Sequence, residues 1–369
     1  MNAPMMMDLH PHSLDVPTSL DLLLTQTVDM GGSDLHLTVG IPPCLRLHGS
    51  LMPLPGWPNL EPDDTQRLVH SALNDEQWRH FSRDHEMDTA YGVPGVSRFR
   101  VNVYRQRGSV GAVFRVIPHK IPRLEDLGLP LSIEKFAQLP RGLVLVTGPT
   151  GSGKSTTMAS LLDVANRTRS GHIMTIEDPI EYMHMHQKCL VNQREVGVDT
   201  ANFAVALKHV LRQDPDIILV GELRDLETTS VAVTAAETGH LVLATLHTQS
   251  ASQTIERLID IYPSHQQSQI RAQLSNCLQG VVTQALAPRK DGTGRVAITE
   301  VMVVNPAIRN LIREAKTYQI PTVIQSSGEL GMVTFDQSLA NAFIEQLISK
   351  QAAIDLARDP AEFRRLARI

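Results

Sequence analysis

Aromatic residues are scarce in this chain, and its net charge is not positive. Phe, Trp and Tyr make up 4% of its 369 residues, which argues against binding of single-stranded nucleic acid by base stacking. The formal net charge is -5, so there is no global electrostatic attraction for a phosphate backbone. We therefore expect no nucleic acid among the partners of this protein.

Cysteine is almost as scarce. Cys44, Cys189 and Cys277 lie far apart and form no CxxC pair, so a structural zinc site is not expected. An odd number of isolated cysteines is typical of reduced thiols in a cytoplasmic protein.

Long hydrophobic runs are missing as well. No stretch of 18 uncharged apolar residues occurs, which predicts that no segment spans a membrane. The first twelve residues, MNAPMMMDLHPH, have neither a basic start nor an apolar core, so we expect no signal peptide. These absences predict a cytoplasmic protein, which can still bind a protein partner at a membrane surface.

The first 120 residues mix helical and strand patterns, which predicts an α+β N-terminal domain. Helical spacing at 18–30 ends at Gly31-Gly32, a pair that stops a helix. Further helices are expected at 62–73 and 75–82. Alternating apolar residues predict strands at 34–39, 45–48, 97–104 and 110–117.

Because the segment that follows is rich in proline, we interpret residues 121–140 as a linker. From residue 141 to 304, short apolar runs alternate with helical segments, as in a mostly parallel sheet covered by helices. This predicts an α/β domain, followed by a helical region at 305–369. The expected strands lie at 142–147, 172–176, 216–221, 241–246 and 296–304.

A glycine-rich turn follows the first of these strands and matches GxxxxGK[ST] in full. Backbone N–H groups of such a turn surround a phosphate, and the next helix adds the positive end of its dipole. Lys154 is expected to contact the β- and γ-phosphates, and Ser155 to bind Mg²⁺. The cofactors predicted are therefore ATP and Mg²⁺. The predicted nucleotide-binding residues are Gly148, Pro149, Thr150, Gly151, Ser152, Gly153, Lys154, Ser155 and Thr156.

Acidic residues end two other predicted strands. Glu222 follows the apolar run DIILVG. In P-loop enzymes, an acid at the end of such a strand lies beside Mg²⁺. Glu177, Asp178 and Glu181 follow the run HIMTI, and one of these acids or Glu222 is expected to orient the attacking water. His247 follows the strand LVLATL and is expected to approach the γ-phosphate.

Three segments resemble the signature boxes of the secretion-superfamily ATPases, the hexameric motors of type II secretion and type IV pili. TIEDPIEY at 175–182 is similar to the Asp box, RQDPDIILVGELRD at 212–225 to Walker B, and TAAETGHLVLATLHT at 234–248 to the His box. PAIRNLIREAK at 306–316 looks like the AIRNLIRE motif of the pilus retraction branch. SDLHLTVGIPP at 33–43 and RFRVN at 98–102 resemble the N-terminal domain of that branch.

The resemblance implies a PAS-like N-terminal domain, a RecA-like ATPase domain and a homohexameric ring. It assigns Lys154 as the Walker A lysine, Glu181 as the Asp-box glutamate and Glu222 as the Walker B glutamate. His247 becomes the His-box histidine. Arg100 and Arg115 match arginines of the N-terminal domain that reach the nucleotide.

The function implied is ATP-driven retraction of a type IV pilus, hence twitching motility, at the cytoplasmic face of the inner membrane. The implied partners are copies of the same chain, a platform protein at the pilus base and a second retraction ATPase. Two alternatives remain: an assembly or secretion motor of the same superfamily, and an accessory subunit that only binds nucleotide. The AIRNLIRE-like segment and the lack of a four-cysteine motif favour retraction.

The AIRNLIRE-like segment follows Pro306, which suits the first turn of a helix. Ile308, Leu311 and Ile312 fall on one apolar stripe, as expected of a helix packed on a core. We expect the charged face, with Arg309 and Arg313, to couple ATP hydrolysis to retraction.

Overall fold

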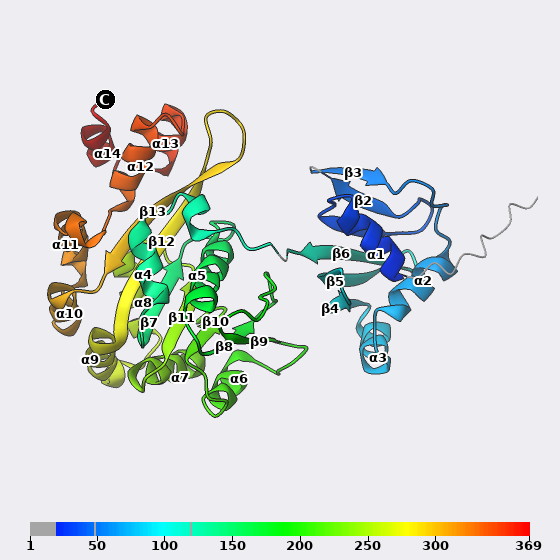
Figure 1. Ribbon diagram of the computed structural model, residues 1–369, viewed down its shortest axis with the longest axis horizontal. Coiled ribbons are helices and arrows are strands. Elements are labelled where there is room, and N and C mark those ends of the chain that lie inside the picture. The colour runs from blue at the N-terminus through cyan, green and yellow to red at the C-terminus, as the bar shows by residue number, and fades with distance from the viewer. Residues whose placement is uncertain (1–19, 48, 119) are drawn as a thin grey trace, which may run out of the picture. The chain divides into compact units, whose positions relative to one another are not determined.

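The computed structural model describes residues 20–47, 49–118 and 120–369. The expectation that the first twelve residues are not a signal peptide therefore lies outside the described residues. The chain divides into two compact units, Met1–Ile117 and Pro118–Ile369, which are drawn in Figure 1.

The first unit is an antiparallel six-stranded sheet with three helices, as the α+β pattern predicts. Its strands follow the order β3-β2-β1-β6-β5-β4, and large apolar side chains such as Leu23, Phe99 and Phe114 fill its core. The sequence pattern did not indicate β3 or β4. The elements are α1 Leu20–Asp29, β1 Asp34–Leu37, β2 Cys44–Leu47, β3 Ser50–Pro53, α2 Pro62–Ser71, α3 Asp75–Asp84, β4 Glu86–Val93, β5 Ser97–Gln106 and β6 Ser109–Ile117.

The second unit is built on a seven-stranded sheet of order β13-β12-β7-β11-β10-β8-β9. Every pairing in it is parallel except β12 with β13, which confirms the prediction of a mostly parallel sheet. The strands β9 and β12 were not predicted. The strands are β7 Gly142–Thr147, β8 His172–Glu177, β9 Leu190–Glu195, β10 Ile217–Val220, β11 Leu241–Leu246, β12 Leu278–Pro288 and β13 Arg295–Val303.

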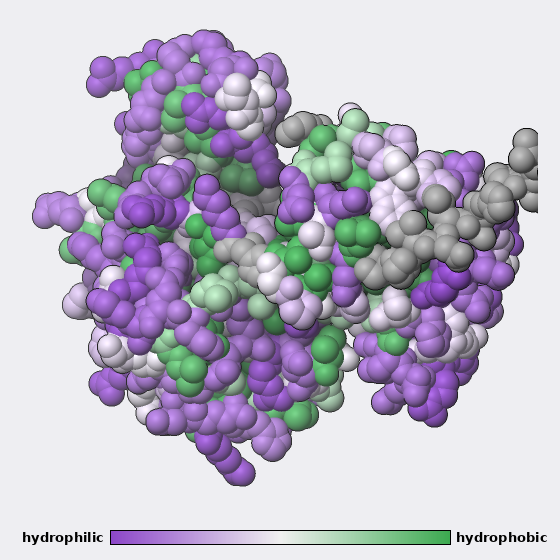
Figure 2. Space-filling view, turned by 45° about the vertical axis from the view of Figure 1, so that its right-hand side comes forward, coloured by the Kyte–Doolittle hydropathy of each residue, from purple (hydrophilic) through white to green (hydrophobic). Residues whose placement is uncertain are grey.

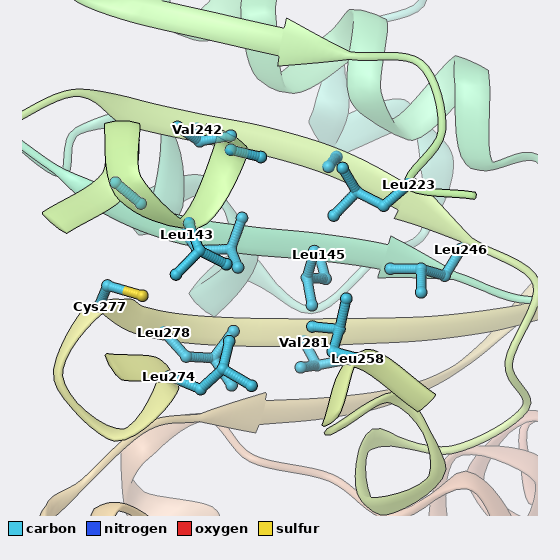
Figure 3. Close-up of a cluster of buried hydrophobic side chains, with 14 of the residues drawn as sticks. Leu143, Leu145, Leu223, Val242, Leu246, Leu258, Leu274, Cys277, Leu278 and Val281 are labelled. Carbon is cyan, nitrogen blue, oxygen red and sulfur yellow. The ribbon is translucent and has the colours of Figure 1, made fainter. Parts of the chain in front are cut away.

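Helices cover both faces of this sheet because its strands are apolar on both sides. Successive residues of β7 point to opposite faces: Leu143 and Leu145 enter one cluster, and Val144 and Val146 enter the other. Figure 3 shows part of the first cluster, where Leu145 lies among side chains that include Leu246 and Val281. One face carries α4 Glu134–Ala137 and α5 Lys154–Thr168; the other carries α6 Phe203–Val210, α7 Leu226–Glu237, α8 Ala251–Asp260, η3 Ser264–Gln266 and α9 Gln267–Cys277.

Residues 121–140, predicted as a linker, pack against the second unit in the structure. They form two short 3₁₀ turns, η1 Leu124–Leu127 and η2 Leu131–Ile133, before α4. Phe136 is buried against Gly280 of β12, where a Cβ atom would come within 2.2 Å of the Phe136 ring. This segment is therefore part of the core of the second unit.

The helical C-terminal region has two parts. The first part, α10 and α11, packs on the sheet core through Ile308, Ile312 and Ile324. The second, α12 to α14, forms its own cluster on the far ends of β12 and β13, around Phe335 and Phe363 (Figure 1). The elements are α10 Pro306–Arg313, η4 Thr317–Gln319, α11 Ile320–Ser326, η5 Gly328–Leu330, α12 Phe335–Ile344, α13 Lys350–Leu356 and α14 Pro360–Ala367.

The surface is mostly hydrophilic on the face drawn in Figure 2, with hydrophobic residues in small groups between polar ones. Within the part of the chain that the structure describes, no helix is both long and apolar enough to cross a membrane.

Candidate functional site

The glycine-rich turn joins β7 to α5, the placement that its sequence predicts. Gly148, Gly151 and Gly153 all have positive φ angles, of 139°, 78° and 88°, which disfavour side chains. A Cβ atom on Gly148 would also approach the backbone oxygen of Gln284 to 2.2 Å. Both backbone conformation and space therefore require glycine at position 148.

Lys154 opens α5 and bends back over the loop. Its Nζ donates to the backbone oxygens of Gly148, at 2.9 Å, and Pro149, at 3.1 Å. Burial lowers the pKa of Lys154 below its ordinary value, although the negative charges of Glu222 and Glu181 act in the opposite direction. The ammonium group thus contacts the loop, and Lys154 lines the same cavity as both glutamates.

Glu222 lies just beyond the end of β10 and is only 18% exposed at its side chain. It contacts two basic groups: Arg224 Nη2 at 2.8 Å and His247 Nε2 at 3.2 Å. His247 comes just after β11, the strand next to β10. The carboxyl ends of parallel strands lie at the same edge of a sheet. Because β10 and β11 are parallel neighbours, the residues that follow them, Glu222 and His247, lie side by side.

The loop after β8 carries Glu181 and is held by Gln193 of β9. The Gln193 amide donates to Glu177 Oε1 at 3.0 Å and to the backbone oxygen of Tyr182 at 2.8 Å, and it accepts the His184 N–H at 2.8 Å. Burial raises the pKa of Glu177 to about 7 despite hydrogen bonds from Thr175 and Gln193. Glu181 itself is exposed.

A cavity of about 570 Å³ at this edge of the sheet brings most of the predicted site residues together. Gly148, Pro149 and Ser152, also predicted, do not line it; Gly148 and Ser152 are buried, whereas Pro149 is exposed. Within the described residues, no three His, Cys, Asp or Glu side chains form a metal-binding cluster. The predicted site residues that line the cavity are Thr150, Gly151, Gly153, Lys154, Ser155, Thr156, Glu181, Glu222 and His247.

The oxygen donors Ser155 and Glu222 suit Mg²⁺, which prefers oxygen ligands and usually retains waters and substrate phosphates as its other ligands. Two protein donors lining one cavity are therefore a fitting set for a Mg²⁺ ion that arrives with a nucleotide.

Sequence reasoning missed four residues of this region. Arg224 pairs with Glu222, and Arg295 lines the cavity from the start of β13. Gln193 and Gln284 hold loops of the site. The polar residue inside the apolar run VVTQALA is a signal that could have indicated Gln284. The position of Arg295 at the cavity follows from the pairing of β12 with β13, which was not predicted.

Arg100 and Arg115, predicted to reach the nucleotide, lie in the first unit. They occupy paired positions on β5 and β6, and both are exposed. Arg115 Nε also contacts Asp34 Oδ1 at 2.8 Å. Burial disfavours the charged Asp34, but hydrogen bonds from Arg115 and Ser33 outweigh burial and hold its pKa below the ordinary value.

Arg309, predicted as part of a coupling surface, makes contacts within the chain. Its Nη1 donates to the backbone oxygens of Ser275, at 2.6 Å, and Asn276, at 2.9 Å, at the C-terminal end of α9. Arg313 Nε donates to Ser275 Oγ at 3.2 Å. These contacts satisfy carbonyls that a helix end leaves open, so this part of the charged face fastens α10 to α9.

Comparison with known proteins places the chain in a family. The profile of the type II/IV secretion system protein family matches residues 112–346. The chain is 50% identical to PilT, a type IV pilus retraction ATPase of Pseudomonas aeruginosa, over 92% of this chain and 98% of that protein. It is 45% identical to a twitching motility protein of Neisseria gonorrhoeae, over 90% of this chain and 89% of that one.

Among solved structures, the pilus retraction motor PilT with bound ADP superposes with a TM-score of 0.87 at 47% identity. The match covers 94% of this chain and 99% of that one. By its sequence and by its fold, the chain belongs to the type II/IV secretion system protein family.

Proposed function

We propose that this chain is an ATPase motor that powers retraction of a type IV pilus. The observation that carries the proposal is Lys154 on a P-loop, in one cavity with Glu181, Glu222 and His247. The chain resembles a retraction ATPase over nearly the whole length of both proteins. This resemblance supports the proposal that ATP hydrolysis at the site powers pilus retraction. Our proposal includes a homohexamer that acts on a platform protein at the cytoplasmic face of the inner membrane, beside a second retraction ATPase.

In this proposal the P-loop N–H groups and Lys154 bind the β- and γ-phosphates of ATP. Ser155 and Glu222 hold Mg²⁺, which offsets phosphate charge when bound. The imidazole of His247 follows β11 beside Glu222 and contacts the γ-phosphate.

Either Glu181 or Glu222 orients the attacking water. Glu222 already binds two basic groups, which favours a role in metal and water positioning. Glu181 is exposed and therefore free to receive a proton from water. Arg100 and Arg115 of the first unit supply positive charge to the transition state, as arginines do in other phosphoryl-transfer enzymes.

Purified full-length protein tests the enzymatic part of the proposal. Wild-type protein should hydrolyse ATP in the presence of Mg²⁺, and Lys154→Ala should fall to background while its circular dichroism spectrum and melting temperature stay near the wild-type values. Normal turnover by a folded Lys154→Ala protein would remove the site assignment.

A further inference from the structure

Gln284 is a polar residue in the middle of strand β12, and both the oxygen and the nitrogen of its side-chain amide form hydrogen bonds. It is 2% exposed. Its Nε2 donates to the backbone oxygen of Ser152 at 2.6 Å, and its Oε1 accepts from Thr157 Oγ1 at 2.9 Å. One side chain of β12 therefore contacts both the P-loop and the first turn of α5.

The contact with Ser152 fixes the direction of a peptide group. In a trans peptide the C=O and the following N–H point in opposite directions. When the Ser152 oxygen is held toward Gln284 in the protein interior, the N–H of Gly153 is aimed the other way, toward the side of the loop that lines the cavity. That N–H belongs to the set that a P-loop offers to phosphate.

Gln284 also lies close to two glycines of the loop, Gly148 and Gly153. Its carbonyl oxygen would lie 2.2 Å from a Cβ atom on Gly148, and its Nε2 would lie 3.0 Å from one on Gly153. Thr157, the second partner, also donates its backbone N–H to the Gly153 oxygen at 3.0 Å. Gln284 thus supports both ends of the loop.

We infer that Gln284 is a positioning residue for phosphate binding, which acts by orienting the Ser152–Gly153 peptide. The inference rests on the proposed ATPase function. Its alternative is that Gln284 only fills and stabilises the core. The two roles predict different results. If Gln284 orients the peptide, its replacement weakens the binding of polyphosphate in a protein that remains folded.

The variant Gln284→Met keeps the length of the side chain and removes both hydrogen bonds; Gln284→Leu removes them with a shorter side chain. The matched control is Gln273→Met on α9, which loses a hydrogen bond to Glu237 Oε2, at 2.8 Å, away from the P-loop. Calorimetry would measure binding of inorganic tripolyphosphate and of Mg-ATP to each full-length protein well below its melting temperature.

We expect both Gln284 variants to bind tripolyphosphate and Mg-ATP about tenfold more weakly than the wild type, as loss of an oriented hydrogen-bond donor implies. Gln273→Met should bind like the wild type. Folded Gln284 variants with affinities within twofold of the wild type would overturn the inference, and so would unfolding of both, since the role would then be structural. If the wild type itself binds neither probe, the proposed function fails instead.

Discussion

At the scale of single residues, Lys154 forms hydrogen bonds with its own loop. Its ammonium group donates to two neutral carbonyl oxygens of its own loop. Charged phosphate oxygens accept stronger hydrogen bonds than carbonyls do, so a nucleotide can displace these contacts. We therefore expect Lys154 to exchange its carbonyl partners for phosphate oxygens when ATP binds.

The pairing of Glu222 with His247 and Arg224 predicts the behaviour of Glu222→Gln. Gln keeps the size of the side chain but loses the charge that holds a metal and orients water. We expect Mg-ATP to bind while kcat falls by at least about a hundredfold, the scale of a lost acid–base group. Single-turnover kinetics on Glu222→Gln and Glu181→Gln would rank the two acids, and near-normal kcat in either would exclude that residue from the chemistry.

Glu177 predicts a pH-dependent stability. Its pKa is about 7 in the folded protein, against an ordinary value of 4.5, so folding favours the protonated form. The stability that this group contributes is fully present below pH 4.5 and is lost as the pH rises through 7. Without nucleotide, the melting temperature of the wild type should therefore fall relative to that of Glu177→Gln between pH 5 and pH 8. Parallel curves for the two proteins would contradict this account of Glu177.

At the scale of elements, the joint between α9 and α10 depends on Arg309. Arg309→Ala removes two donors from carbonyls at the end of α9, which should destabilise the protein by about 1–3 kcal/mol. Chemical denaturation measures this directly. The control is Arg364→Ala on the exposed side of α14, which should change stability little; equal effects of the two variants would show that the capping contacts contribute nothing.

The elements that sequence reasoning found are those whose signal is local. The P-loop, the acids that follow β8 and β10, and the histidine that follows β11 are each marked by a motif and an apolar run. The strand β12 escaped because its run LQGVVTQALAP contains a Gly and two Gln residues. Gly280 leaves space for the Phe136 ring, and Gln284 hydrogen-bonds the P-loop, so these two of the three interruptions depend on tertiary contacts.

The internal contacts of Arg309 were not predicted, for a similar reason. Helical spacing places it outside the apolar stripe of α10, where a charge is normally solvated. Its partners lie more than 30 residues earlier in the chain, and no local pattern indicates that a helix end needs its donors.

At the scale of the whole molecule, the proposed chemistry uses both units. Arg100 and Arg115 belong to the first unit, whereas the P-loop belongs to the second. An arginine supplied to the γ-phosphate contributes about 10³–10⁵ in rate. A truncated chain of residues 118–369, which keeps its own cores, should therefore hydrolyse ATP at least about a hundredfold more slowly than the full chain.

Steady-state ATPase rates of the two proteins at equal site concentration check this. The double variant Arg100→Ala, Arg115→Ala in the full chain is the matched control, because it removes the guanidinium groups and keeps the unit. Equal rates for the full chain, the truncated chain and the double variant would show that the arginines have only a structural role.

The central claim is that ATP hydrolysis by this chain retracts pili, and the most direct measurement is the number of surface pili on cells that lack its gene. The deletion strain is complemented with either the wild-type gene or the Lys154→Ala variant. Comparing the two shows whether retraction needs ATP hydrolysis or only the presence of the protein. The account predicts hyperpiliated cells that do not twitch, restored by the wild type and not by Lys154→Ala. Cells without pili would contradict the account, since the chain would then drive assembly.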